Sequence, residues 1–159
     1  MLAEGTKERH MANAQIYDAK LNKVVTVEKI QKSDEEWKKI LNKKEWEITT
    51  KKGTEAPGSC AFDGVHEAGI FRCVRCDTDL FRSATKFESG TGWPSFFEPI
   101  SQLNILEQPD RGFGMVRTEV LCARCGSHLG HVFDDGPRPT GKRYCMNGFA
   151  LKFVLQSHL

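Results

Sequence analysis

Two Cys-x-x-Cys pairs constrain the fold of this chain more than any other feature. The pairs are Cys73 with Cys76 and Cys122 with Cys125, within a chain of 159 residues. Each pair offers two thiolates from one tight turn, and two such turns complete a closed tetrahedral zinc site. The alternatives are four unconnected thiols or a redox-active pair, but two matching pairs in one small domain favour structural zinc. A closed site of this kind supplies stability and not catalysis.

Chain length and net charge narrow the classes of protein to which this chain can belong. A chain of 159 residues suits one domain with its own core, and its net charge of +2 comes without a long basic patch. We therefore expect no nucleic-acid partner. No apolar run approaches the roughly 20 residues of a membrane span, and no secretory signal is evident, so we expect no membrane contact. Zinc thiolates suit a reducing compartment, and we expect a monomer in the cytoplasm.

The N-terminal part predicts a short helical region. Residues 1–32 form an extension that we expect to be partly disordered, with one short strand at residues 24–27. Ser33 and Glu36 have the spacing of a capping box, which predicts a helix start. Residues 45–52 are compatible with a helix or a strand, but two lysines followed by Gly53 resemble a helix C-terminus and favour a second short helix. Three apolar residues of the first helix share a spacing that indicates a buried stripe: Trp37, Ile40 and Leu41.

From residue 69 onward the sequence predicts short strands divided by Gly, Pro and Asp. The expected strands are residues 69–73, 79–81, 96–100, 114–121, 129–133 and 142–155. The fold class is therefore mainly β, with a short helical N-terminus docked on an antiparallel β domain. We expect the domain to span residues 33–155, with a short tail at residues 156–159.

The last expected strand carries a reactive group. Because strand side chains alternate faces, Arg143, Cys145 and Asn147 point one way, and Tyr144 and Met146 point towards the core. A neighbouring cation lowers the pKa of a cysteine. Cys145 is therefore a candidate nucleophile; the alternative is a buried strand cysteine beside a surface arginine.

Two histidines follow the second cysteine pair. Four thiolates already saturate zinc, so His128 and His131 would be left free for proton delivery near neutral pH. The alternative is two partly buried histidines whose ring nitrogens are satisfied by backbone groups.

Several further motifs occur together in a recognisable order. They are Gly53-Thr54-Glu55, Gly90-Thr91-Gly92-Trp93-Pro94-Ser95-Phe96, Ser127-His128-Leu129-Gly130-His131-Val132-Phe133, Asp135-Gly136-Pro137-Arg138 and Arg143-Tyr144-Cys145-Met146-Asn147. With both cysteine pairs, this constellation closely resembles the methionine-R-sulfoxide reductases, the MsrB family. The likeness covers roughly residues 33–155.

The resemblance implies a fold of two packed antiparallel sheets, the β-tent of that family, with one structural zinc ion at one end. It implies reduction of the R epimer of methionine sulfoxide, mainly in oxidised proteins, as a repair of oxidative damage. By position, Cys145 matches the nucleophile of the family. Trp93 and Phe96 match the wall that binds the substrate. Five further residues match groups that surround the sulfoxide or tune the nucleophile. These residues are His128, His131, Asn147, Asp135 and Arg143.

The chemistry explains why such residues are needed. Sulfoxide sulfur is electrophilic, but its oxygen leaves only once protonated, so a thiolate and an acid must act together. Cys145 supplies the thiolate, and His128 or His131 supplies the proton. Methionine leaves and Cys145 becomes a sulfenic acid, which condenses with a second thiol to a disulfide. Thioredoxin would then reduce that disulfide.

The chain departs from the family at the second thiol. Many members carry a resolving cysteine inside the Gly-x-Gly-Trp-Pro motif, where this chain has Thr91. Zinc would occupy four of the other cysteines, which leaves Cys60 in a Pro/Gly loop as the expected resolving thiol. The alternative is that Cys60 is a bystander and a small reductant restores Cys145 directly.

Two rival functions remain from the residues alone. A zinc-bearing β module that binds a partner explains the cysteine pairs but not the residues around Cys145. A thiol peroxidase or disulfide oxidoreductase would use Cys145 without needing Trp93 as a wall for a methyl group. A Cys145→Ser variant and separated sulfoxide epimers discriminate these readings.

Overall fold

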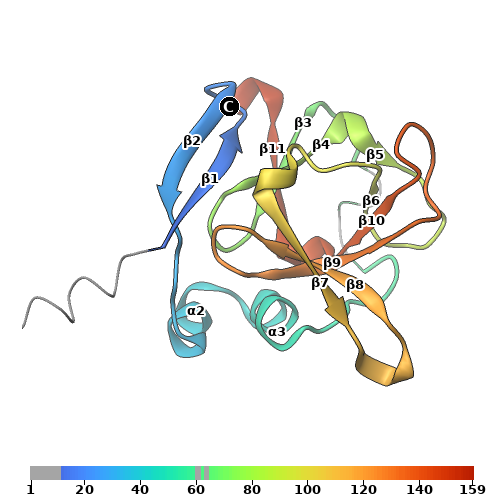
Figure 1. Ribbon diagram of the computed structural model, residues 1–159, viewed down its shortest axis with the longest axis horizontal. Helices are drawn as coiled ribbons and strands as arrows, with labels where there is room; N and C mark the ends of the chain where they lie inside the picture. Colours follow the sequence, from blue (N-terminus) through green and yellow to red (C-terminus); the bar gives the residue numbers. More distant parts are fainter. Residues whose placement is uncertain (1–11, 60–61, 63–64) are drawn as a thin grey trace, which may run out of the picture.

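The computed structural model describes residues 12–59, 62 and 65–159, and its strands form three antiparallel sheets (Figure 1). One sheet is the hairpin β1-β2, one has three strands in the order β11-β3-β4, and one has six in the order β5-β6-β10-β9-β8-β7. The prediction of a mainly β, antiparallel protein is confirmed. The strand bounds are β1 Asn13–Asp18, β2 Lys23–Glu28, β3 Gly69–Cys73, β4 Asp79–Arg82, β5 Lys86–Phe87, β6 Ser95–Phe96, β7 Ile105–Asp110, β8 Arg117–Cys122, β9 His128–Phe133, β10 Arg143–Met146 and β11 Leu151–Leu155.

Aromatic side chains join the three-stranded and six-stranded sheets. Phe96 of β6 stacks on Phe81 of β4, with ring centroids 4.4 Å apart, and meets Phe71 of β3 edge-on at 5.1 Å. Tyr144 of β10 packs on Phe81 from the same sheet as Phe96. All four side chains are buried, and each such ring contributes about 1.5–3 kcal/mol through the apolar surface that it removes from water.

A buried amide attaches the N-terminal hairpin to the body. The Asn104 side chain accepts a hydrogen bond from Tyr17 N (2.8 Å) and donates to the carbonyl oxygens of Tyr17 (3.0 Å) and Asp79 (2.6 Å). Only residues 24–27 were expected to form a strand here, and the structure adds β1, which pairs with β2 along its whole length. Most residues of this hairpin are exposed or half-buried, so its sequence lacks the apolar alternation that would have predicted two strands. Residues 1–11 lie outside the described part of the chain.

Both predicted helices are present, as α2 (Asp34–Ile40) and α3 (Lys43–Lys51). Capping boxes begin each of them, at Ser33 for α2 and at Asn42 for α3. Within the apolar stripe, Trp37 and Leu41 are buried but Ile40 is 60% exposed, so the prediction for Ile40 was wrong. Helix α3 ends with Lys52 in the left-handed conformation, one residue before the predicted glycine. Within the described ranges, no helix is long and apolar enough to cross a membrane.

The expected strand at residues 142–155 is two strands in two different sheets. β10 belongs to the six-stranded sheet, and β11 belongs to the three-stranded sheet. A 3-10 turn at Gly148–Ala150 separates them, with both of these residues buried. The chain therefore crosses from one sheet to the other immediately after Cys145 and Asn147. This crossing places the candidate nucleophile next to the junction of the two sheets.

Candidate active site

The four cysteines of the two pairs lie close together in the folded chain. Their sulfur atoms all lie within 4.8 Å of one another, and the distances Cys73–Cys125 and Cys76–Cys122 are both 3.6 Å. A tetrahedral zinc ion with bonds of about 2.3 Å separates its sulfur ligands by roughly 3.8 Å. The donor set and its geometry therefore fit one closed metal site.

The two cysteine turns have the same backbone hydrogen bonds. Asp77 N donates to Cys73 O, and Gly126 N donates to Cys122 O, both at 2.9 Å. Burial is the largest cause that raises the pKa of the Cys73 thiol, and the neighbouring sulfurs add to it. Four thiolates so close together need a cation to neutralise them, which is the chemistry that a bound metal supplies.

The arginines inside these turns attach the N-terminal elements. Arg75 donates to the hydroxyls of Thr49 (3.1 Å) and Thr50 (2.6 Å) on α3, and its guanidinium lies 4.8 Å from the ring centroid of Trp37 on α2. Arg124 donates to Glu28 O at the end of β2. These contacts could not be predicted from the sequence, because they depend on where the helices and the hairpin dock.

Cys145 lies in the middle of β10, between β9 and β6. It stands directly opposite His131 of β9 and Ser95 of β6. Directly opposite residues project from the same face of a sheet, so the sulfur of Cys145 and the imidazole of His131 share one cavity. Gly130 permits this approach, because a Cβ atom there would lie 2.2 Å from Cys145 O.

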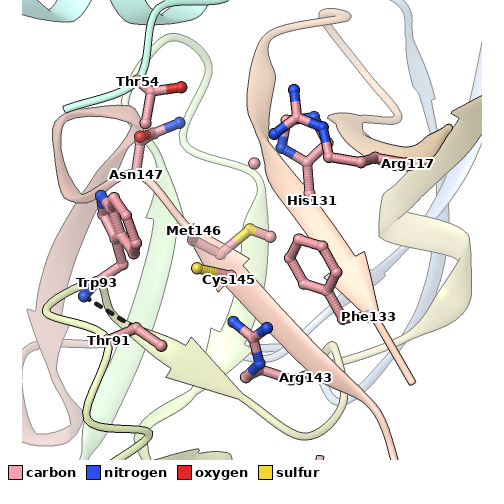
Figure 2. Close-up of a pocket in the computed structure, with 11 residues that line it drawn as sticks. Thr54, Thr91, Trp93, Arg117, His131, Phe133, Arg143, Cys145, Met146 and Asn147 are labelled. Carbon is pink, nitrogen blue, oxygen red and sulfur yellow. Dashed lines mark hydrogen bonds between the residues drawn. The ribbon is translucent and has the colours of Figure 1, made fainter. Parts of the chain in front are cut away.

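A cavity of about 220 Å³ surrounds this position. Figure 2 shows Trp93, Asn147 and Thr54 along one wall, His131 and Arg117 along the opposite wall, and Cys145 between them. The remaining lining residues are Thr91, Gly130, Phe133, Arg143 and Met146. The cavity therefore brings an aromatic wall, a thiol and an imidazole to one place.

Burial and charge act on Cys145 in opposite directions. Burial is the largest influence and raises the pKa of its thiol, and the negative charge of Glu55 adds to that effect. Arg143 and a hydrogen bond with Thr91 lower the same pKa. The sequence predicted the sign of the Arg143 effect, but the net direction is upward, because the cavity withdraws the sulfur from water.

Arg143 is held from two sides. Its guanidinium donates to both carboxylate oxygens of Asp135, at 2.9 and 3.2 Å, and lies 4.4 Å from the ring centroid of Phe133. This bidentate ion pair lowers the pKa of Asp135. Asp135 is itself exposed, so it contributes by fixing the cation beside Cys145 and does not line the cavity.

His131 is bonded to a carboxylate. Its Nε2 lies 2.8 Å from Asp110 Oδ2, and the same oxygen lies 3.4 Å from a guanidinium nitrogen of Arg117. The hydrogen bond from His131 is the largest cause that lowers the pKa of Asp110 to about 2. Because that carboxylate is ionised, Nε2 must carry the proton, which fixes the orientation of the ring.

His128 lies behind the cavity and does not line it. It is 2% exposed, and its Nδ1 donates to Glu119 Oε2 at 2.6 Å. Glu119 also accepts from Gln108 and pairs with Lys52. Burial is the main cause that lowers the pKa of His128. A carboxylate therefore holds each of the two rings, Glu119 for His128 and Asp110 for His131.

Glu55 connects the aromatic wall to the segment after Cys145. Its carbonyl oxygen accepts from Trp93 Nε1 (2.9 Å), and its backbone N donates to Asn147 Oδ1 (3.2 Å). Its Oε1 accepts from Phe149 N (2.9 Å), whereas its Oε2 is buried and has no hydrogen-bond partner among the described residues. Trp93 and Asn147, both predicted site residues, are thus held by one backbone segment.

Two predicted residues stand apart from this site. Phe96 is fully buried in the core and does not line the cavity, so its assignment to substrate contact is corrected. Its strand partner in β10 is Tyr144, whose side chain faces the core and away from Cys145. Cys60 lies outside the described residues.

Sequence reasoning missed the polar residues of β7 and β8. Arg117 lines the cavity, Asp110 holds His131, and Glu119 holds His128. Within the expected strand at residues 114–121, Val116, Thr118 and Val120 alternate with Arg117 and Glu119. This alternation places Arg117 and Glu119 on the same face, so the sequence did contain a signal for them. Asp110 had no such signal, since β7 shows no alternation.

Comparison with known proteins agrees with this geometry. Residues 41–155 match the SelR domain family. Relatives named peptide methionine sulfoxide reductase MsrB come from Pseudomonas syringae (50% identical over 131 residues, 82% of this chain and 100% of the relative) and Herminiimonas arsenicoxydans (51% over 126 residues, 79% and 92%). One from Methanosarcina barkeri is 52% identical over 124 residues, which cover 78% of this chain and 87% of the relative. The chain therefore belongs to the MsrB family of methionine sulfoxide reductases.

Proposed function

We propose that the protein reduces methionine-R-sulfoxide to methionine, mainly in oxidised proteins, with Cys145 as the nucleophile. The observation that carries this proposal is the cavity in which the Cys145 sulfur lies between Trp93 and His131. The rigid indole offers an apolar surface for the S-methyl group of the substrate. The imidazole faces it from the other side, where a proton can reach the sulfoxide oxygen.

The redox step balances between the two sulfur atoms. The Cys145 thiolate attacks the sulfoxide sulfur while a proton is delivered to its oxygen. The oxygen ends on Cys145 as a sulfenic acid, so methionine sulfur gains two electrons and Cys145 sulfur loses two. Arg143 favours the thiolate that begins this sequence.

His131 is the proton donor of choice. It lines the cavity, whereas His128 is buried behind it with a lowered pKa. Asp110 holds the His131 ring in place through the 2.8 Å contact with its Nε2. His128 and Glu119 then serve to hold β9 against β8.

Cys60 would restore Cys145 by forming a disulfide with release of water. The segment that leads to Cys60 is fixed at the cavity, because Gly58 N donates to Gly92 O and Glu55 contacts both Trp93 and Asn147. Thioredoxin would then reduce the Cys60–Cys145 disulfide by thiol exchange.

One zinc ion would occupy the four-cysteine cluster. Four thiolates leave no open position on zinc, so the ion would be structural. We expect the protein to act as a monomer in a reducing compartment such as the cytoplasm, where these thiolates stay available.

Separated sulfoxide epimers test the reaction. The wild-type protein should reduce N-acetyl-methionine-R-sulfoxide and leave the S epimer unchanged, and Cys145→Ser should abolish turnover. Equal reduction of both epimers, or none of the R form, would contradict the proposal.

Peptide mapping tests the resolving thiol. After one equivalent of R-sulfoxide without reductant, a Cys60–Cys145 disulfide is expected, and Cys60→Ser should leave a sulfenic acid that a dimedone probe labels. A disulfide between Cys145 and any zinc-site cysteine in the wild-type protein would refute the role of Cys60.

A further inference from the structure

A second, larger cavity adjoins the one that holds Cys145. Its volume is about 520 Å³. Thr91 and Arg143 line both cavities, so the two spaces meet across these side chains, which stand at the edge of the first cavity in Figure 2. The other lining residues of the second cavity are Phe87, Glu88, Ser89, Asp135, Gly136 and Pro137.

The accessible charges of this second cavity are negative. The carboxylates of Glu88 and Asp135 are 63% and 66% exposed, whereas their cationic partners Lys86 and Arg143 are only 5% and 16% exposed. A ligand that enters from solvent therefore meets carboxylate oxygens first, and the cations lie beneath them. Phe87 is half-buried and also lines this cavity, so it adds an apolar surface to the lining.

We propose that this second cavity holds the polypeptide that flanks the oxidised methionine, and that it favours a lysine or arginine there. The proposal rests on the proposed function, because the sulfoxide side chain must fill the Cys145 cavity for its backbone to reach the shared rim. A cationic side chain matches the site in two ways: its head meets the Glu88 carboxylate, and its aliphatic stem covers Phe87. A free amino-acid substrate would leave this cavity unused.

Substrate length and charge test the proposal together. The kcat/KM of the full-length protein is measured with dithiothreitol as reductant for three R-sulfoxide substrates: N-acetyl-methionine sulfoxide methylamide, a pentapeptide with lysine on both sides of the sulfoxide, and one with glutamate there. We expect the lysine peptide to exceed the glutamate peptide by roughly two- to five-fold, the range of a partly exposed ion pair.

Glu88→Gln should remove that preference and leave the methylamide unchanged. Glu98→Gln is the matched control, since Glu98 is exposed and lines neither cavity; it should keep the preference. Equal rates for both peptides and the methylamide in the wild type would overturn the inference. So would a Glu88→Gln effect that appears with thioredoxin and not with dithiothreitol, since the cavity would then bind the reductant.

Failure of the proposed function and failure of the peptide subsite would give different results. A wild-type protein that cannot reduce the methylamide R-sulfoxide contradicts the proposed function itself. A protein that reduces the methylamide but ignores flanking charge contradicts only the peptide subsite.

Discussion

Cys145 stands between a cation on its own strand and a carboxylate from the loop after α3. Arg143 lowers the pKa of its thiol, and Glu55 raises it. Arg143 was evident from the sequence, because it lies two residues away on the same strand face. Glu55 was not, because 90 residues separate it from Cys145 and only the folded contacts to Trp93 and Asn147 bring it near.

Removing the cation should shift the reactivity of Cys145 to higher pH. Arg143→Ala raises the pKa of the thiol, so less thiolate is present at neutral pH. We expect activity at pH 7 to fall by about tenfold, equivalent to about 1.4 kcal/mol of barrier. The pH dependence of iodoacetamide alkylation in a Cys60→Ser background measures the shift. Arg138→Ala, an exposed arginine two residues from Gly136, is the control, and an unmoved alkylation midpoint would count against this assignment.

Removing the carboxylate charge should act in the opposite direction. Glu55→Gln keeps an oxygen that accepts from Phe149 N, but it deletes the negative charge that raises the pKa of Cys145. The alkylation midpoint should therefore move to lower pH. A midpoint that rises would mean that Glu55 acts through the position of Trp93 and not through its charge.

At the scale of elements, the helices and most strands followed from local pattern. The capping boxes at Ser33 and Asn42 depend on residues three apart, so the sequence displays them directly. The division of residues 142–155 into two strands depended on a distant partner. These residues alternate like one strand. However, the backbone N–H and the side chain of Asn147 both donate to Leu129 O, and the chain turns there into the other sheet.

β7 escaped prediction for a different reason. It contains Pro109, which cannot donate to a neighbouring strand, and most of its residues are exposed. Such a segment is tolerated only at the edge of a sheet, and β7 is the last strand of its sheet. β7 is held in an extended conformation by its pairing with β8, and its own residues show no pattern that predicts a strand.

Arg75 should stabilise the contact between the helices and the cysteine turn. Arg75→Ala removes two charged hydrogen bonds to α3 and a cation–π contact with Trp37, so we expect a loss of about 2–4 kcal/mol in the free energy of unfolding. Arg75→Lys keeps the charge but lacks the planar guanidinium, so its free energy of unfolding should lie between those of the wild type and Arg75→Ala. Urea denaturation measures both, and equal stability of all three proteins would disprove the contact's contribution.

At the scale of the whole molecule, the cysteine cluster joins the two main sheets. One pair lies between β3 and β4 of the three-stranded sheet, and the other lies between β8 and β9 of the six-stranded sheet. Leu151 of β11 pairs with Cys73, and β11 follows closely after Cys145. The cysteine cluster is thus connected through one strand pair to the segment that bears Cys145.

Removal of the proposed zinc ion should therefore destabilise both sheets and the site between them. A chelator that strips zinc should lower the free energy of unfolding by about 5 kcal/mol or more, given the strength of structural zinc sites. Activity should fall in parallel. Zinc content by atomic emission and thermal unfolding follow the loss, with Cys60→Ser as a variant that keeps its zinc. A metal-free protein of unchanged stability would exclude the structural role.

The loop that leads to Cys60 contacts Gly92, the residue before Trp93, through a hydrogen bond from Gly58 N to Gly92 O. A Cβ atom at Gly92 would lie 2.7 Å from Pro57 Cβ and 2.9 Å from Gly58 N, so the two loops are interlocked without spare room. In the proposed reaction, methionine leaves when the Cys145 sulfenic acid forms, and the second thiol reacts only afterwards. We therefore expect initial rates against both substrates to give the parallel reciprocal plots of a double-displacement enzyme, and intersecting plots would contradict this order.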